Sequence, residues 1–194
     1  MICLLFLMLV NSVFWKLDPV WRQKVVATQS SVFAQGEIGR LLISPYVHSD
    51  LKHLMANASM FFVLAIFIYG YFGAAPLLIL SFPLAAVIEA VTLKSYPPDV
   101  GLLGISGVVY AMCGFWLVLY LFIDRRRSFW KRLLRGMGFT FAVLLPTTFE
   151  PQVSYTAHAV GFAVGLLYGL IHFAIYHQAL RAAEVFELDE GSGD

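Results

Sequence analysis

Residues 104–123 read GISGVVYAMCGFWLVLYLFI, an uncharged run whose length and apolar character suit a membrane-spanning helix. Ser106 is the third residue of this run. A second apolar run, residues 157–177, carries His158 at its second position. A hydroxyl that can act as a nucleophile and an imidazole that can act as a base therefore each lie just inside a predicted membrane span.

The composition is that of a membrane protein with several spans. Of 194 residues, 60% are hydrophobic and only 13% are charged, and the mean hydropathy is +0.78, a balance that is not typical of soluble domains. We therefore predict an all-α polytopic membrane protein in which residues 1–180 form one domain, a six-transmembrane-helix bundle. The predicted spans are residues 1–15, 51–72, 74–93, 102–123, 136–150 and 157–177.

A basic segment between the fourth and fifth spans predicts the orientation of the chain. Short loops rich in Lys and Arg stay on the cytoplasmic side of a membrane. With six spans, both termini are then also cytoplasmic. We expect the protein to lie in the inner or plasma membrane of the cell. The loop at about residues 16–50 then lies on the outer face and is expected to be ordered. The acidic tail, residues 181–194, is expected to be disordered. The basic residues are Arg125, Arg126, Arg127, Lys131, Arg132 and Arg135.

Four polar residues share one predicted depth in the membrane. The second, fourth and sixth spans run in the same direction, and each carries polar side chains near its start: His53 and Asn57, then Ser106, then His158. At about 1.5 Å per residue, these groups lie in one layer a few residues below the outer surface. The active layer is therefore predicted to open to the outer face.

Small residues predict that the fourth and sixth spans lie close together. Gly161 and Gly165 follow His158 on one face of the sixth span, and small stripes allow membrane helices to approach each other. Generic close packing would give the same stripe. Tyr110, one turn after Ser106, is expected to stack against His158. The stripe on the fourth span is Gly104, Gly107, Ala111 and Gly114.

The chemistry that these residues predict is that of a Ser/His dyad. Serine is a weak nucleophile until a neighbouring base takes its proton, and no Asp or Glu is predicted in the same layer. His53 and Asn57, four residues apart on one helix, join the backbone amide of Ser106 as candidate donors to an oxyanion. Taken singly, each has a simpler interpretation, since a membrane Ser often bonds to its own helix and a buried His can serve packing.

The sequence gives no indication that the protein binds a cofactor or nucleic acid. There is no metal-ligand spacing of Cys and His, no zinc-protease motif and no phosphate-binding loop. A net charge of +1 gives no basis for binding nucleic acid. We predict no metal and no cofactor.

The chain resembles the rhomboid family of intramembrane serine proteases, most closely the bacterial GlpG type with a six-helix core. Three segments carry the resemblance in this order: residues 53–57, HLMAN; residues 104–111, GISGVVYA; and Ala157 and His158 with the glycines that follow. The resemblance implies Ser106 as nucleophile and His158 as general base and acid. It implies an oxyanion site of His53, Asn57 and the Ser106 amide.

The same resemblance implies supporting roles for Tyr110 beside His158 and for Arg40 in the first loop. Three positions depart from the family pattern: Gly39 replaces a Trp before Arg40, Tyr155 stands where an Asn is usual, and Ser44 stands where a further loop His is usual, while His48 remains. Because of these departures, the substrate preference of the family cannot be assumed for this chain. They leave the catalytic positions intact.

The implied activity is hydrolysis of peptide bonds in or next to transmembrane segments of other membrane proteins, within the lipid bilayer. Two alternatives remain open. One is a non-catalytic rhomboid-like protein that binds membrane helices. The other is a small transporter, or a haem-binding bundle with His53 and His158 as axial ligands, which a visible absorption spectrum would test. The sequence does not predict the oligomeric state.

Overall fold

The structure is a computed structural model that describes all residues except 1, 126, 149–152 and 183–194. The described residues form helices and contain no strand, apart from one isolated bridge between Ala27 and Leu102. In chain order the helices are α1 (Ile2–Phe14), α2 (Pro19–Val25), η1 (Ser30–Ala34), η2 (Ile38–Leu42), η3 (Ser44–Tyr46), α3 (Leu51–Phe72), α4 (Ala74–Ser81), α5 (Pro83–Leu93), α6 (Ser106–Ile123), α7 (Phe129–Thr148) and α8 (Tyr155–Ala182).

The all-α prediction is confirmed, and four segments are long and apolar enough to cross a membrane. They are α3, the pair α4 and α5 taken as one segment, α6 and α8. Helices also cover the described parts of the predicted spans 1–15 and 136–150, with residues 1, 149 and 150 outside the described residues. However, α1 is short and α7 carries three cations in its first two turns. That α1 and α7 cross the membrane stays a prediction.

Four predicted spans differ from the helices in detail. The sixth, predicted at 157–177, is longer and corresponds to α8, Tyr155–Ala182. The third is broken at Phe82 and Pro83, because the proline ring at the start of α5 cannot donate a hydrogen bond to α4. The fourth begins at Ser106 rather than at residue 102, so Gly104 is not part of the helical stripe. The fifth begins seven residues early, at Phe129, because the Arg132 side chain binds the carbonyl of Asp124 at 2.6 Å and that of Leu121, which fixes the first turn of α7.

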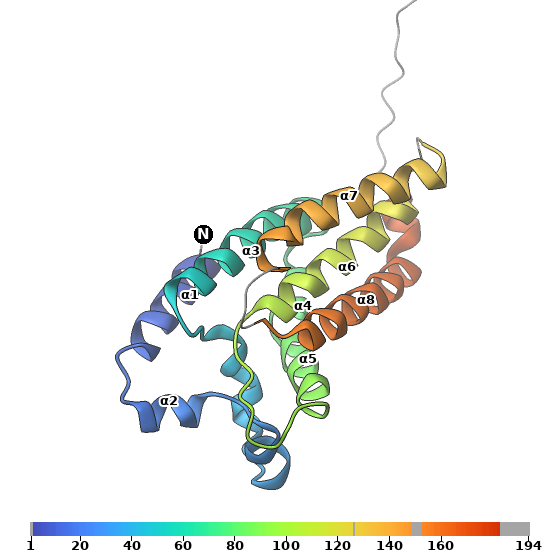
Figure 1. The fold of residues 1–194 in the computed structure, drawn as a ribbon. Coiled ribbons are helices and arrows are strands. Elements are labelled where there is room, and N and C mark those ends of the chain that lie inside the picture. Colours follow the sequence, from blue (N-terminus) through green and yellow to red (C-terminus); the bar gives the residue numbers. More distant parts are fainter. Residues whose placement is uncertain (1, 126, 149–152, 183–194) are drawn as a thin grey trace, which may run out of the picture.

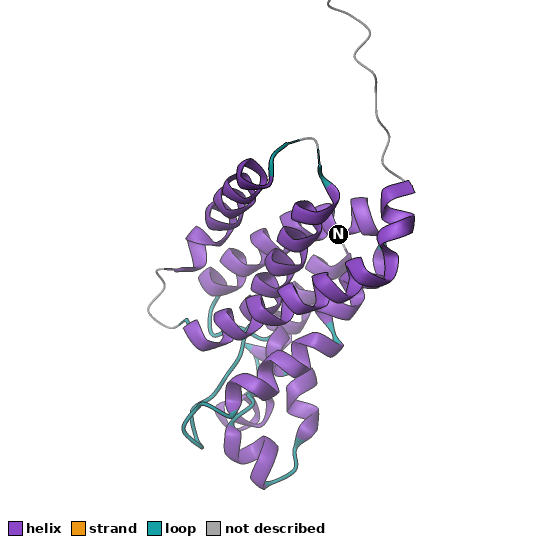
Figure 2. Ribbon diagram, turned by 90° about the vertical axis from the view of Figure 1, so that its right-hand side faces the viewer, coloured by secondary structure: helices purple, strands orange, loops and turns teal. Residues whose placement is uncertain are grey.

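Helix α6 is the centre of the molecule. Its neighbours include α3, α7 and α8, and most of its side chains are buried. Figure 1 shows α6 lying side by side with α8, which runs in the same direction. Figure 2 shows the same helices from the side, joined by loops. The starts of α3, α6 and α8 therefore meet the loops at one end of the bundle.

The segment between α1 and α3 folds as short helical turns. Arg40 ties two parts of it together, since its guanidinium donates to the carbonyls of Gln23 and Val26 at 2.6 and 2.7 Å and pairs with Glu37 at 2.5 Å. Of the tail predicted at 181–194, the first two residues belong to α8. The remainder lies outside the described residues.

Candidate active site

The first turn of α3 is fixed by Asp50 and presents two of the predicted site residues. The Asp50 carboxylate accepts the backbone N–H of His53 at 2.8 Å and the hydroxyl of Ser49 at 2.8 Å. These two bonds hold the pKa of Asp50 below its ordinary value. His53 is half-buried, and Asn57, one turn later on the same face, is fully buried.

Ser106 is the first residue of α6 and follows a segment that is held by the chain between α1 and α3. The N–H of Leu102 donates to the Ala27 carbonyl at 2.8 Å, and the Ser44 hydroxyl donates to the Leu102 carbonyl. Gly104 then has φ of +102°, a conformation that L side chains rarely adopt. A Cβ at Gly104 would lie 3.1 Å from the ring of His53. A glycine is thus required where the chain turns beside His53 into α6.

His158 is held beside α6 by glycines and by a stacked ring. A Cβ at Gly161 would overlap the backbone of Gly107, so the two helix backbones touch at this level. The ring of Tyr110 stacks on the imidazole of His158, with centroids 3.9 Å apart and planes at 14°. Tyr155 lies edge-on to the same imidazole at 6.3 Å. The imidazole is therefore positioned by aromatic contacts from α6 and from the start of its own helix.

Several buried polar atoms of this layer have no hydrogen-bond partner among the described residues. They are both side-chain atoms of the Asn57 amide and Nε2 of His158. Ser106, which is 7% exposed, likewise has no recorded side-chain hydrogen bond to the described residues, His158 included. Buried polar groups are nearly always paired in folded proteins. This group of unpaired donors and acceptors is what a site that awaits a polar ligand would contain.

An open cavity of about 310 Å³ reaches Ser106 from the loop end of the bundle. His53 and Ser49 line it from the start of α3. Tyr96 and Ser154, whose hydroxyls bond to each other, line it from the loops before α6 and α8. The remaining lining residues are Val100, Gly101, Leu102, Leu103 and Val153. Polar and apolar groups are both available here to an extended peptide and to water.

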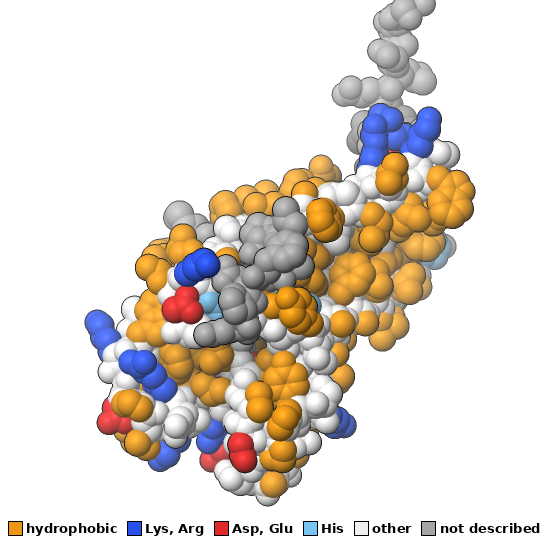
Figure 3. All heavy atoms as spheres, viewed as in Figure 1, with side chains coloured by type: hydrophobic (Ala, Val, Ile, Leu, Met, Phe, Trp, Pro, Cys, Tyr) orange, Lys and Arg blue, Asp and Glu red, His pale blue; other side chains and the backbone are white. Residues whose placement is uncertain are grey.

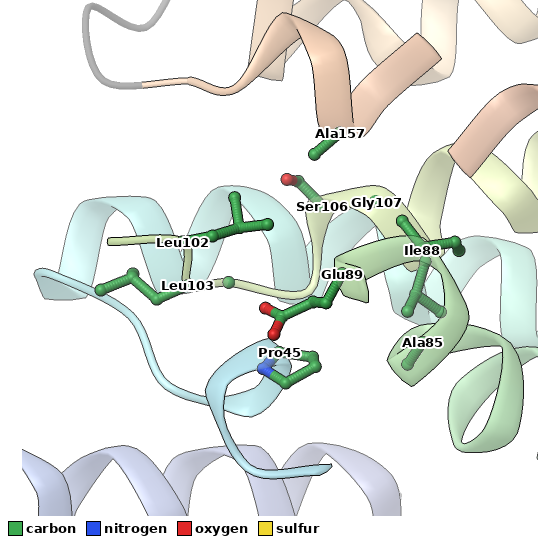
Figure 4. Close-up of a pocket in the computed structure, with 11 residues that line it drawn as sticks. Pro45, Ala85, Ile88, Glu89, Leu102, Leu103, Ser106, Gly107 and Ala157 are labelled. Carbon is green, nitrogen blue, oxygen red and sulfur yellow. The ribbon is translucent and has the colours of Figure 1, made fainter. Parts of the chain in front are cut away.

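A second cavity, of about 10 Å³, lies behind Ser106 and is shown in Figure 4. Glu89 of α5 lines it, is 4% exposed, and has no hydrogen-bond partner for either carboxylate oxygen among the described residues. In Figure 4 the Ser106 hydroxyl points toward the side of Ala157, whereas the Glu89 carboxyl points away from it, toward Pro45. The Glu89 carboxyl therefore does not face the Ser106 hydroxyl.

Two residues of the site environment, His48 and Glu89, were not predicted. His48 is fully buried; its Nε2 accepts the N–H of Ile105 at 3.4 Å, and its ring lies 5.0 Å from that of His53. Asn11 of α1 bonds to its backbone N–H at 2.7 Å and faces Nδ1 at 3.3 Å. The sequence carries no spacing that relates residues 11, 48 and 105. A charged residue in an apolar span was the available signal for Glu89.

His48 is predicted to make stability fall on acidification. Burial, with a smaller contribution from His53, lowers the pKa of His48 to about 3 from an ordinary 6.5. As the pH falls below 6.5, the unfolded chain binds a proton that the folded protein does not, and the free energy of unfolding decreases until about pH 3. Between pH 7.5 and pH 5 the loss from this group is about 2 kcal/mol.

The measurement is unfolding of the detergent-solubilised protein at several pH values, compared with His48→Gln, whose amide oxygen can still accept the Ile105 N–H. The difference in stability between the two proteins should shrink as the pH falls. A difference that does not change with pH would mean that His48 does not stay neutral in the folded protein.

The structure brings most of the predicted residues together. His53 and Ser106 share the open cavity, and Tyr110 contacts His158. Gly161 and Gly165 lie on the contact between α6 and α8. Arg40 stands apart, since its recorded partners all belong to the outer loop. Gly104 supports the site through its backbone turn rather than through helix packing.

Comparisons with known proteins identify the family of this chain. The chain is similar to the Rhomboid protease GlpG of Haemophilus influenzae, with 31% identity over 150 residues that make up 75% of each chain. It is also similar to a protein of Acanthamoeba polyphaga mimivirus named "Putative rhomboid protein L523", with 28% identity over 68% of this chain and 74% of that protein. Residues 35–175 match the model of the Rhomboid domain. The chain belongs to the rhomboid family.

Proposed function

We propose that this protein is an intramembrane serine endopeptidase that hydrolyses peptide bonds in or next to transmembrane segments of membrane proteins. The observation that carries the proposal is that Ser106, His158 and Asn57 are all buried, and that the Asn57 amide and Nε2 of His158 have no hydrogen-bond partner among the described residues. Membership of the rhomboid family and the similarity to a rhomboid protease support it. The protein would lie in the cell membrane with both termini in the cytoplasm and its active site open to the outer face.

The proposed reaction proceeds through an acyl-enzyme. The Oγ of Ser106 attacks the scissile carbonyl carbon while Nε2 of His158 takes the hydroxyl proton. The imidazolium then gives that proton to the departing amine, and the peptide C–N bond breaks. Water next attacks the ester carbonyl and passes a proton to His158, which returns it to Ser106 as the acid product leaves. Stacking on Tyr110 orients the imidazole in place of a carboxylate.

The start of α6 supplies the proposed oxyanion site. The first amides of a helix have no acceptor within the helix, so the N–H of Ser106 is available to a developing negative charge. The Asn57 amide is buried without a partner and can donate from α3. His53, which lines the same cavity as Ser106, is the third proposed donor.

The open cavity fits this role because a protease inside a bilayer must admit water and an extended peptide. Its lining combines Ser49, His53, Tyr96 and Ser154 with apolar residues. Its lining comes from the start of α3, the start of α6 and the loops that precede α6 and α8. A membrane helix would have to unwind locally to place its backbone there, since a helix hides its peptide bonds.

The direct test is labelling of the purified protein by a fluorophosphonate, which reacts with an activated serine. Wild type should be labelled at Ser106, and His158→Ala should not be labelled. His177→Ala is the matched control, because His177 is a half-buried histidine on the same helix, far along the chain from Ser106, and it should be labelled as wild type is. Absence of labelling in all three proteins would favour the alternative, a non-catalytic rhomboid-like protein that binds membrane helices.

Asn57→Ala is predicted to slow catalysis without unfolding the protein. Removal of one oxyanion donor costs about 100-fold to 1,000-fold in kcat, and no folded-state hydrogen bond to a described residue is lost, since the Asn57 amide has none. Asn11→Ala is the contrast. The Asn11 amide donates to the carbonyls of Leu7 and Tyr46 at 2.8 Å, so its loss should lower the melting temperature.

Kinetics and thermal unfolding of both variants would check this prediction. An unchanged kcat for Asn57→Ala would remove Asn57 from the oxyanion site. A large fall in its melting temperature would instead indicate a structural role.

A further inference from the structure

A pocket at the opposite end of α6 from Ser106 carries a concentration of positive charge. It lies between the end of α6 and the start of α7, and its volume is about 680 Å³. Its lining residues are Tyr120, Asp124, Arg127, Ser128, Lys131 and Arg135. Figure 3 shows Lys and Arg side chains gathered at this end of the molecule, beside hydrophobic ones. The proposed active site does not use this pocket.

The three cations follow one another at intervals of four residues. Lys131 and Arg135 therefore lie on one face of α7, and Arg127 precedes the helix. All three are exposed, and no ion pair with a described residue is recorded for any of them. Asp124 is the only acid among the six lining residues, so the pocket has an excess of positive charge. Tyr120 and Ser128 add two hydroxyl groups that can donate hydrogen bonds.

The pocket is held in shape by a residue that does not line it. The guanidinium of Arg132 donates to the carbonyls of Leu121 and Asp124, at the end of α6, and so connects the two helices. It lies near the face of the Phe129 ring, 5.9 Å from its centroid. Arg132 therefore fixes the start of α7, which carries Lys131 and Arg135, against the end of α6.

The pocket lies at the level where lipid headgroups are expected, which indicates the chemical class of its ligand. Helix α6 covers 18 residues, so its end lies roughly 25 Å from Ser106 at about 1.5 Å per residue. That distance is close to the thickness of the hydrocarbon layer. Trp130 is 74% exposed and Leu134 is 76% exposed, next to the cations. Aromatic and apolar side chains that border cations are typical of the level of lipid headgroups.

We propose that this pocket binds the phosphate headgroup of an anionic phospholipid from the leaflet opposite the active site. Arg127, Lys131 and Arg135 surround the phosphate, and Tyr120 and Ser128 donate to its oxygens. Trp130 and Leu134 contact the acyl chains. A zwitterionic lipid, whose choline group compensates the phosphate charge, binds more weakly. Basic pockets at membrane helices bind anionic headgroups by this complementarity.

The test is lipid binding by the full chain in a neutral detergent, counted by native mass spectrometry. A short-chain phosphatidylglycerol and a phosphatidylcholine of equal chain length are the probes. Phosphatidylglycerol should bind about tenfold more tightly. Lys131→Gln should weaken its binding about fivefold, and the triple variant R127Q/K131Q/R135Q should lose the preference over phosphatidylcholine.

Matched variants separate the pocket from total charge and from folding. Lys16→Gln, Lys24→Gln and Lys94→Gln together remove the same charge near the other end of the bundle and should change the affinity less than twofold. The triple variant R127K/K131R/R135K keeps the charges and should keep the preference. Circular dichroism and thermal unfolding check that each protein is folded.

Four outcomes would overturn the proposal. The first is that R127Q/K131Q/R135Q still prefers phosphatidylglycerol to phosphatidylcholine. The second is that the triple lysine control loses as much affinity for phosphatidylglycerol as R127Q/K131Q/R135Q does. The third is that inorganic phosphate displaces the bound lipid at the same concentration as added phosphatidylglycerol does. The fourth concerns the acidic tail as a rival occupant: E184Q/E187Q/D189N/E190Q should leave lipid affinity within twofold, and a rise above about tenfold would show that the tail fills the pocket.

Discussion

Ser106→Ala is expected to abolish cleavage of a single-span reporter protein by the purified enzyme in lipid vesicles. The proposed mechanism has no second nucleophile, since the Glu89 carboxyl points away from the Ser106 hydroxyl and toward Pro45. In serine proteases, loss of the nucleophile costs up to about 10⁶ in kcat. A fall of at least about 10⁴-fold is expected here. The measurement is the rate of product formation at saturating reporter, resolved by gel electrophoresis.

The control for this prediction is Ser59→Ala. Ser59 also lies in a membrane helix, α3, but its hydroxyl donates to the Ala56 carbonyl of its own helix at 2.9 Å. Its loss should leave the rate within about twofold of wild type. Residual cleavage by Ser106→Ala above one tenth of the wild-type rate would refute the dyad. If a preparation made without this protein cleaved the reporter at the same rate, the cleavage would come from a contaminating protease.

Gly165→Ala is expected to destabilise the protein strongly. A Cβ at Gly165 would overlap the backbone of Ala111, and backbone cannot move aside as a flexible side chain can. Helices α6 and α8 would have to separate, at a cost of about 3 kcal/mol. For a chain of this size, the melting temperature should fall by roughly 6–12 °C. Because Gly165 lies two turns beyond His158, this effect reports packing rather than chemistry.

The same substitution at Gly138 provides the comparison. Gly138 is also helical, in α7, but a Cβ there would meet no atom within 4 Å. Gly138→Ala should leave stability unchanged or raise it by up to about 1 kcal/mol, because alanine favours helix more than glycine does. Thermal unfolding in detergent compares the two variants. Equal melting temperatures would mean that α6 and α8 can repack around the added methyl group.

The sequence predicted the helical class and the layer that contains the site because both depend on short-range patterns. Runs of apolar residues predict helices wherever water is absent. The depth of His53, Ser106 and His158 follows from counting residues along parallel spans. The stacking of Tyr110 on His158 could be predicted for a similar reason, since one helical turn separates Tyr110 from Ser106. The catalytic roles of these residues stay predictions, which the variants above test.

Helix boundaries required the tertiary structure. Apolar residues before Ser106 predict a helix, but Leu102 bonds to Ala27 of the segment between α1 and α3, and Gly104 adopts a positive φ, so the chain is not helical there. Cations before residue 136 read as loop, but Arg132 joins the start of α7 to the end of α6 through carbonyl groups. In both cases a contact between distant segments outweighed the local preference.

The sequence by itself determined the helical class of the protein and the small residues that let α6 approach α8, and it predicts the depth of the polar residues in the membrane. Each of these follows from hydropathy or from helical period. Tertiary structure alone decided that His48 and Asn11 support the segment before Ser106, that Glu89 lies behind the site and faces away, and that three cations share one pocket with Tyr120. These contacts join residues far apart in the chain, and no local pattern encodes them.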